Sequence, residues 1–198
     1  MSAGLRIAAL DPATYRRTPW KNGGGVTIDI ADAYQPGATP GGWDGMIWRF
    51  GRTGTRTRAP FSDLTGYDRI LAVVVGRGAV LETPGGEIDV REPFRPVRFR
   101  GETPIVARLE AGPVEVVNLI GDRNAVRLDM AFLNPGEARA LAPGIHVAYA
   151  PTGPIALASD SSRHDVPPDH ALRIDAADPA SLRCESGLAL IASIVRVV

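Results

Sequence analysis

The chain has 198 residues, of which 44% are hydrophobic and 22% are charged, and this composition excludes a disordered, collagen-like or coiled-coil protein. Its 22 Lys and Arg residues balance its 22 Asp and Glu residues. A chain without net charge has no general attraction for a phosphate backbone or an anionic lipid surface. We therefore expect neither nucleic acid nor membrane among its partners.

The sequence pattern predicts a cytoplasmic protein. The longest nearly unbroken apolar run, residues 70–75, is far shorter than the about 20 residues that a membrane helix needs. Residues 1–10 lack the basic and then apolar pattern of a secretory signal. The single cysteine, Cys184, excludes an internal disulfide and fits a reducing compartment.

Short runs rich in Val, Ile and Leu, separated by Gly, Pro, Asp or Asn, recur along the whole chain. They predict strands at 26–33, 46–53, 70–75, 79–83, 105–110, 114–120, 126–133, 145–150, 155–159 and 188–198. The 22 glycines and 17 prolines argue against long helices, and residues 34–43 form the clearest loop. This spacing of strands and turns predicts an all-β sandwich or barrel.

A weak internal repeat suggests two copies of one β unit. Shifting the chain on itself by 75 residues aligns turn formers with turn formers and strands with strands, and the identical pairs include Ile70 with Ile145 and Gly112 with Gly187. We read the repeat as two small β-barrels that pack together. Residues 1–125 would form the N-terminal barrel with the pocket and residues 126–198 the C-terminal barrel, with strand exchange between them permitted.

The most unusual segment is Pro-Trp-Lys-Asn-Gly-Gly-Gly at 19–25. Its glycines, Gly24 among them, allow positive φ and close approach of the backbone to a ligand, while Lys21 and Asn22 can both donate hydrogen bonds. A tight loop before the first strand, with Trp20 as a core anchor, explains the segment equally well. It is no phosphate-binding P-loop, because no Gly-Lys-Ser/Thr follows the glycines.

A second group of candidates follows Trp48 and Arg49. In an alternating strand Ile47 and Arg49 share one face, and an arginine on the interior face of a barrel is costly unless it meets a carboxylate. That carboxylate could come from a ligand or from Asp68, which precedes Arg69 at the start of the next strand. A purely structural pair of Arg49 with Asp68 is therefore the competing interpretation.

The order of these motifs resembles the HutD/Ves family. The resemblance covers roughly residues 15–125 and is carried by PWKNGGG at 19–25, WR at 48–49, PFS at 60–62, GYDR at 66–69, F-x-G at 99–101, GPV at 112–114 and Asn118. It implies a bicupin fold, two cupin-like jelly-roll barrels in one compact unit, in agreement with the repeat. It also implies a link to histidine catabolism, where HutD resembles a small-molecule binder that restrains the pathway, or to stress and cold response.

The chain departs from the family pattern at three places. Val116 stands where family members usually carry an aspartate two residues before the retained Asn118, and Ala59 precedes Pro60 where glycine is common. The segment 121–124 also lacks the usual paired arginine and glycine. These changes leave the barrel pattern intact and put the ligand of the parent family in question.

The residues argue against a metal site, a nucleophile and a nucleotide cofactor. The histidines, His146, His164 and His170, all lie in the second half and form no His-x-His pair, and Cys184 lies in a strand pattern as a small core residue. Ser62 lacks the Gly-x-Ser-x-Gly context of a hydrolase nucleophile, and no dinucleotide fingerprint is present. We expect no metal and no cofactor.

We therefore expect an N-terminal barrel that binds a small anionic metabolite, such as urocanate or a formylated or formiminated glutamate, in a regulatory or sequestering role. The residues expected to contact this ligand are Lys21, Asn22, Gly24, Trp48, Arg49, Phe61, Ser62, Asp68, Arg69 and Asn118. Two alternatives stay open. One is a metal-independent isomerase or hydrolase with Asp68, Tyr67 or Lys21 as acid or base, and the other is a scaffold with a vestigial pocket. A homodimer is compatible with all three.

Overall fold

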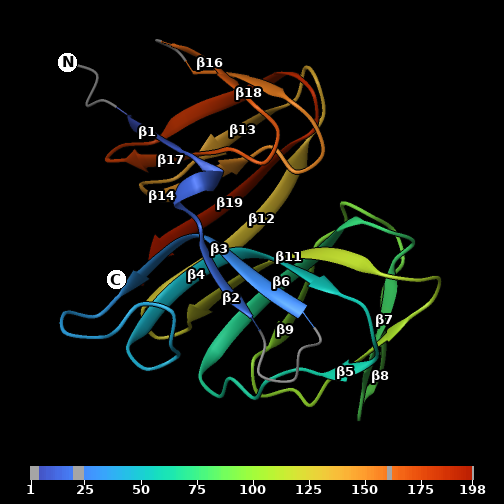
Figure 1. The fold of residues 1–198 in the computed structure, drawn as a ribbon. Helices are drawn as coiled ribbons and strands as arrows, with labels where there is room; N and C mark the ends of the chain where they lie inside the picture. The colour runs from blue at the N-terminus through green and yellow to red at the C-terminus, as the bar shows by residue number, and fades with distance from the viewer. Residues whose placement is uncertain (1–4, 20–24, 160–161, 198) are drawn as a thin grey trace. The chain divides into compact units, whose positions relative to one another are not determined.

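The computed structural model describes residues 5–19, 25–159 and 162–197, and over these ranges the chain is all-β, as predicted (Figure 1). The helical structure of the described residues is one 3-10 turn, η1 (Pro12–Thr14), and no described helix is long and apolar enough to cross a membrane. The chain divides into two compact units. The first is Tyr15–Leu128, and the second combines Met1–Thr14 with Asp129–Val198.

The first unit contains a six-stranded and a four-stranded sheet. The six-stranded sheet has the order β2 (Arg16–Pro19), β3 (Gly25–Tyr34), β4 (Met46–Thr55), β11 (Val114–Asp122), β6 (Tyr67–Val75) and β9 (Val97–Arg100). The four-stranded sheet has the order β5 (Ala59–Pro60), β10 (Val106–Leu109), β7 (Ala79–Thr83) and β8 (Gly86–Val90). All the neighbouring strands whose register is given pair antiparallel.

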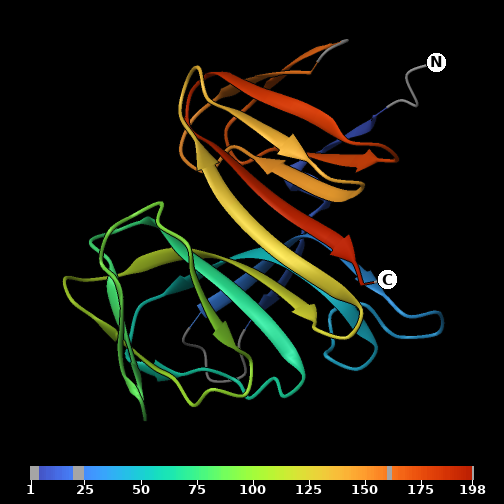
Figure 2. The same cartoon turned by 180° about the vertical axis from the view of Figure 1, so that it is seen from behind.

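The second unit repeats this plan. Its five-stranded sheet has the order β1 (Arg6–Leu10), β17 (Ala171–Ala176), β14 (Gly144–Tyr149), β19 (Ala189–Arg196) and β12 (Val126–Leu133). Its four-stranded sheet has the order β13 (Ala138–Leu141), β18 (Ala180–Ser186), β15 (Ile155–Ala158) and β16 (Arg163–Val166). Because β1 pairs with β17, the start of the chain belongs to the second unit (Figure 2).

The strand order confirms the repeat predicted at 75 residues. The order β4-β11-β6-β9 in the first unit corresponds to β12-β19-β14-β17 in the second, and β5-β10-β7-β8 corresponds to β13-β18-β15-β16. Even unusual backbone positions match: Phe94 and Asp169, which are 75 residues apart, are the described non-glycine residues with positive φ, at 63° and 65°. Two copies of one β unit therefore make up the described chain.

The core of the first unit lies where its two sheets contribute inward-facing apolar residues. As the alternation predicted, Ile105 and Ala107 belong to this core and Leu109 packs against it. Each of the ten predicted runs overlaps a strand of the structure. The strands that the sequence did not predict are mostly four or five residues long, such as β8 and β9, and such short segments give little periodic signal.

Candidate functional site

A cavity of about 550 Å³ lies in the first unit and is lined by side chains from both of its sheets. The six-stranded sheet and its loops contribute Thr18, Thr27, Gly41, Trp43, Arg49, Gly51, Thr53, Thr55, Arg69, Leu71, Val114, Val116, Asn118 and Ile120. The four-stranded sheet and its loops contribute Pro60, Phe61, Ser62, Leu64, Ala79, Leu81, Val90, Ala107 and Leu109. The size fits a small metabolite.

Strand register places two arginines at the same level of the cavity wall. Ile120 on β11 is opposite Arg49 on β4 and also opposite Arg69 on β6, so the two arginines flank one central strand. Residues directly opposite each other in a sheet point to the same face, and two strand spacings separate them by about 10 Å at the Cα atoms. Both arginines are buried, with exposed fractions of 8% and 7%.

Arg49 is held by a carboxylate and an indole. Its Nε lies 3.6 Å from Oδ1 of Asp29, and its guanidinium carbon lies 3.8 Å from the ring centroid of Trp43. Stacking occupies a face of the guanidinium and leaves its in-plane N–H groups available for hydrogen bonds. The arrangement suits an anion that approaches from the cavity in the plane of the guanidinium.

Arg69 has aromatic neighbours and an amide partner. Its guanidinium carbon lies 4.7 Å from the ring centroid of Phe61 and 5.2 Å from that of Phe99, and its Nη2 donates to Oδ1 of Asn118 at 3.2 Å. Its buried Nε has no hydrogen-bond partner among the described residues. Burial, and then the nearby charge of Arg49, lowers the pKa of Arg69 to about 10. An anion in the cavity would stabilise this guanidinium.

Asp29 is the acidic residue of the site, and no sequence pattern indicated it. It lies on β3 at a register irregularity between Asp29 and Ala31, and it pairs with Gly51 on β4. A β-bulge of this kind changes the direction of a side chain. Oδ2 of Asp29 accepts hydrogen bonds from Nε and Nη2 of Arg16, whereas Oδ1 has no hydrogen bond within the described part of the chain.

The charges around the arginines do not balance. Arg16 also pairs with Asp32, so Asp29 and Asp32 oppose the three guanidinium groups of Arg16, Arg49 and Arg69. Over the ranges 5–19, 25–159 and 162–197, no carboxylate forms an ion pair with Arg69. Among the described residues, the buried guanidinium of Arg69 therefore lacks an ionic partner, which a carboxylate of a ligand could supply.

Five of the predicted ligand contacts line this cavity, namely Arg49, Phe61, Ser62, Arg69 and Asn118. Lys21, Asn22 and Gly24 lie outside the described residues. Trp48 and Asp68 do not line the cavity. Gly41, Trp43 and the threonines of β2, β3 and β4 line it without having been predicted.

The expectation that Trp48 would wall the cavity is corrected by strand alternation. Trp48 directly precedes Arg49 on β4, so its side chain points to the opposite face, where it is 1% exposed. The signal was already present in the sequence, because the same alternation assigned Arg49 to the interior.

The suggested structural pair of Arg49 with Asp68 is also replaced. Asp68 accepts a hydrogen bond from Nε of Arg123 at 3.1 Å and lies 3.6 Å from Arg100, outside the cavity. The side chain of Arg69, the next residue on the strand, faces the cavity. Asp29 is therefore the carboxylate that partners Arg49.

Trp43 is positioned by two tyrosines. Tyr67 Oη donates to the carbonyl groups of Trp43 and Met46, at 3.2 and 2.9 Å, and Tyr34 Oη accepts from the backbone N–H of Gly41 at 2.9 Å. The two hydroxyls hold the loop between β3 and β4, and the indole of Trp43 in this loop thereby reaches Arg49. Tyr67 is engaged in this way and does not line the cavity, which weakens its suggested role as an acid or base.

The histidines and the cysteine lie in the second unit. His146 is 1% exposed and bonds Ser193 through Nδ1 and the carbonyl of Ala142 through Nε2. Burial raises the pKa of the Cys184 thiol, which is fully buried in a core cluster. No group of three His, Cys, Asp or Glu side chains within the described ranges could hold a metal ion.

Comparison with known proteins identifies the family. The model of the HutD family matches residues 12–192. The chain belongs to the HutD family. An uncharacterized 21.2 kDa protein in the hutC 3' region of Pseudomonas putida is 36% identical to it over 116 residues, which are 58% of the length of each protein.

Solved structures share the fold of this HutD family member. HutD from Pseudomonas fluorescens SBW25 is similar with a TM-score of 0.80 at 22% identity, covering 98% of this chain and 100% of that one. A conserved protein of unknown function from Pseudomonas aeruginosa PAO1 gives 0.81 at 21% identity, with coverages of 96% and 97%. Salicylate 1,2-dioxygenase from Pseudaminobacter salicylatoxidans, a cupin-fold enzyme, gives 0.54 at 9% identity, with coverages of 82% and 76%. With the repeated strand order, this likeness confirms the bicupin fold.

Proposed function

We propose that the cavity of the first unit binds a small carboxylate metabolite and that the protein senses or sequesters it. The observation that carries the proposal is the pair of buried guanidiniums, Arg49 and Arg69, at one level of the cavity wall, with Asp29 as their acidic neighbour. Charge-assisted hydrogen bonds from these groups would hold the carboxylate, so the protein itself supplies the positive charge that a metal would otherwise provide.

The family directs the choice of metabolite. Membership of the HutD family links the chain to histidine catabolism, and the relative from Pseudomonas putida is named for its position beside hutC. The candidates are therefore the carboxylates of histidine breakdown, namely urocanate, formylglutamate and formiminoglutamate. We favour binding over turnover, because Tyr67 and Asp68, two of the groups suggested as acid or base, lie outside the cavity lining.

Calorimetric titration with these three metabolites tests the proposal. Each hydrogen bond from a charged group contributes about 1.5–3 kcal/mol, so Arg49→Ala or Arg69→Ala should weaken the binding about tenfold to a hundredfold. Arg49→Lys should recover little of the affinity, because an ammonium cannot replace the planar fork of a guanidinium.

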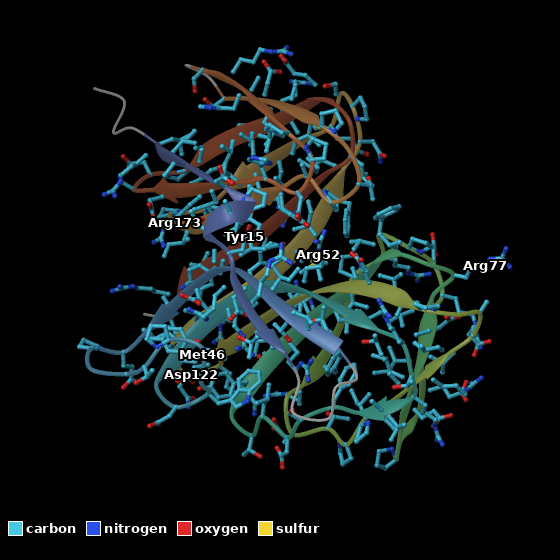
Figure 3. All side chains as sticks on the ribbon, viewed as in Figure 1. Tyr15, Met46, Arg52, Arg77, Asp122 and Arg173 are labelled. Atoms are coloured by element: carbon cyan, nitrogen blue, oxygen red, sulfur yellow. The ribbon has the colours of Figure 1, made fainter. Side chains whose placement is uncertain are left out.

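Arg52→Ala is the matched control. Arg52 lies on β4, the same strand as Arg49, and is labelled in Figure 3. It does not line the cavity, and it pairs with Glu115. Its removal should leave the affinity unchanged. The proposal is wrong if none of the three metabolites binds below millimolar concentration, or if Arg49→Ala and Arg69→Ala both bind as the unaltered protein does.

A further inference from the structure

The cavity is polar at one end and largely hydrocarbon beyond it. The level of Arg49 and Arg69 lies toward the end of the sheet where β4 begins and β11 ends, the end marked by Met46 and Asp122 in Figure 3. Arg77, in the turn after β6, marks the opposite end of the same unit. The strand β11 extends between the end of the cavity with the arginines and the other end, so its lining residues show how the wall changes between the two ends.

Along β11, the lining residues beyond the level of the two arginines are uncharged. Asn118 lies one step inward from Ile120, and Val116 and Val114 follow at the next two positions of the same face. Val116 is opposite Thr53, which is four residues, or about 13 Å of strand, beyond Arg49. Beyond Asn118, the polar side chains that the described residues add to this wall are those of Thr18, Thr27, Thr53 and Thr55.

Apart from Ser62, the described lining from the four-stranded sheet and its loops is hydrocarbon. The side chains that face this part of the cavity from the four-stranded sheet are Ala79, Leu81, Val90, Ala107 and Leu109, and Leu71 joins them from β6. Of the described lining residues, Arg49 and Arg69 are the charged ones. Within the lining formed by residues 5–19, 25–159 and 162–197, a second carboxylate on the ligand would lie against hydrocarbon and hydroxyl groups. Burial of a charge without an ionic partner is strongly unfavourable.

We propose that the ligand of this cavity carries a single carboxylate, bound at Arg49 and Arg69, joined to an uncharged and largely apolar body that fills the space toward Val116 and Leu81. This inference rests on the proposed function, because it assigns the chemical class of the ligand of that same site. Among the candidates from histidine breakdown it favours urocanate over the glutamate derivatives, which carry a second carboxylate.

A pair of probes matched in length tests the ligand class. Hexanoate and adipate have the same six-carbon chain and differ in whether the far end is a methyl or a carboxylate. In calorimetric titrations of the 198-residue protein at neutral pH, we expect hexanoate to bind at least tenfold more tightly than adipate. The binding of hexanoate should be lost or strongly weakened in Arg69→Ala.

The possible results separate this inference from the proposed function. Adipate that binds as tightly as hexanoate, in a manner that depends on Arg69, would overturn the single-carboxylate class and leave the carboxylate site intact. If neither probe nor any metabolite binds, both proposals are wrong. Hexanoate binding that persists in Arg49→Ala and Arg69→Ala would also contradict the inference, because the carboxylate would then not be held by the arginines.

Val116 offers a second test from the protein side. Val116→Asp places a carboxylate in the hydrocarbon part of the cavity, whereas Val116→Asn has nearly the same shape without the charge. We expect Val116→Asp to weaken hexanoate binding at least threefold more than Val116→Asn does. Equal effects of the two variants would contradict an uncharged ligand body next to Val116. Circular dichroism of both variants establishes that the β-structure is retained.

Discussion

The indole of Trp43 stacks on the guanidinium of Arg49, with the guanidinium carbon 3.8 Å from the ring centroid, although the two residues lie on a loop and on a strand. Trp43 is 40% exposed while Arg49 is 8% exposed, so the indole separates a buried cation from solvent. This contact restrains the position of the guanidinium. The N–H groups of Arg49 are thereby oriented to donate hydrogen bonds before a carboxylate binds.

Replacing Trp43 should weaken carboxylate binding. Trp43→Leu removes the contact that orients Arg49 before the ligand binds, and because this contact is worth about 0.5–2 kcal/mol, the loss of affinity should not exceed roughly thirtyfold. Trp43→Phe keeps an aromatic face and should retain most of the affinity. Titration calorimetry of both variants measures the effect, and equal binding by Trp43→Leu and the unaltered protein would show that the indole does not organise Arg49.

Gly51→Ala should destabilise the first unit. A Cβ at Gly51 would lie 2.6 Å from the backbone carbonyl oxygen of Ile28, which is part of the strand that carries Asp29. Overpacking against backbone typically costs about 1–3 kcal/mol of unfolding free energy. Chemical denaturation measures this cost. Gly54→Ala is the control on the same strand, because a Cβ there would meet nothing within 4 Å, and a similar loss in both variants would contradict the argument.

Acid should destabilise the second unit through His146. Burial lowers the pKa of this imidazole, so the folded protein binds its proton less readily than the unfolded chain does. The stabilisation is therefore present above the ordinary histidine pKa of about 6.5 and is lost as the pH falls below it toward the folded pKa.

Urea denaturation between pH 8 and pH 5 measures this dependence. The unfolding free energy should fall with pH below about 6.5, and the fall should be smaller in His146→Gln. His170→Gln is the control, because His170 is only partly buried and bonds the carbonyl of Pro168. Identical slopes in His146→Gln and the unaltered protein would assign the acid sensitivity to other groups.

Much of the fold could be predicted because two patterns are visible in the sequence itself. One is the two-residue alternation within strands, and the other is the repeat at 75 residues. The same alternation predicts that the side chain of Arg49 faces the cavity and that the side chain of its neighbour Trp48 does not. Asp29 could not be predicted, because its direction depends on a β-bulge and on the space that Gly51 leaves. Trp43 lies in a loop, whose path depends on hydroxyl contacts from Tyr34 and Tyr67 that no periodic pattern encodes.

The most direct test of the carboxylate site is a crystal structure of the protein grown with a saturating concentration of the histidine-breakdown carboxylate that binds most tightly in calorimetry. The account predicts ligand density in the cavity of the first unit, with carboxylate oxygens within hydrogen-bond distance of the guanidiniums of both Arg49 and Arg69. Ligand density elsewhere, or a carboxylate that contacts neither arginine, would contradict it.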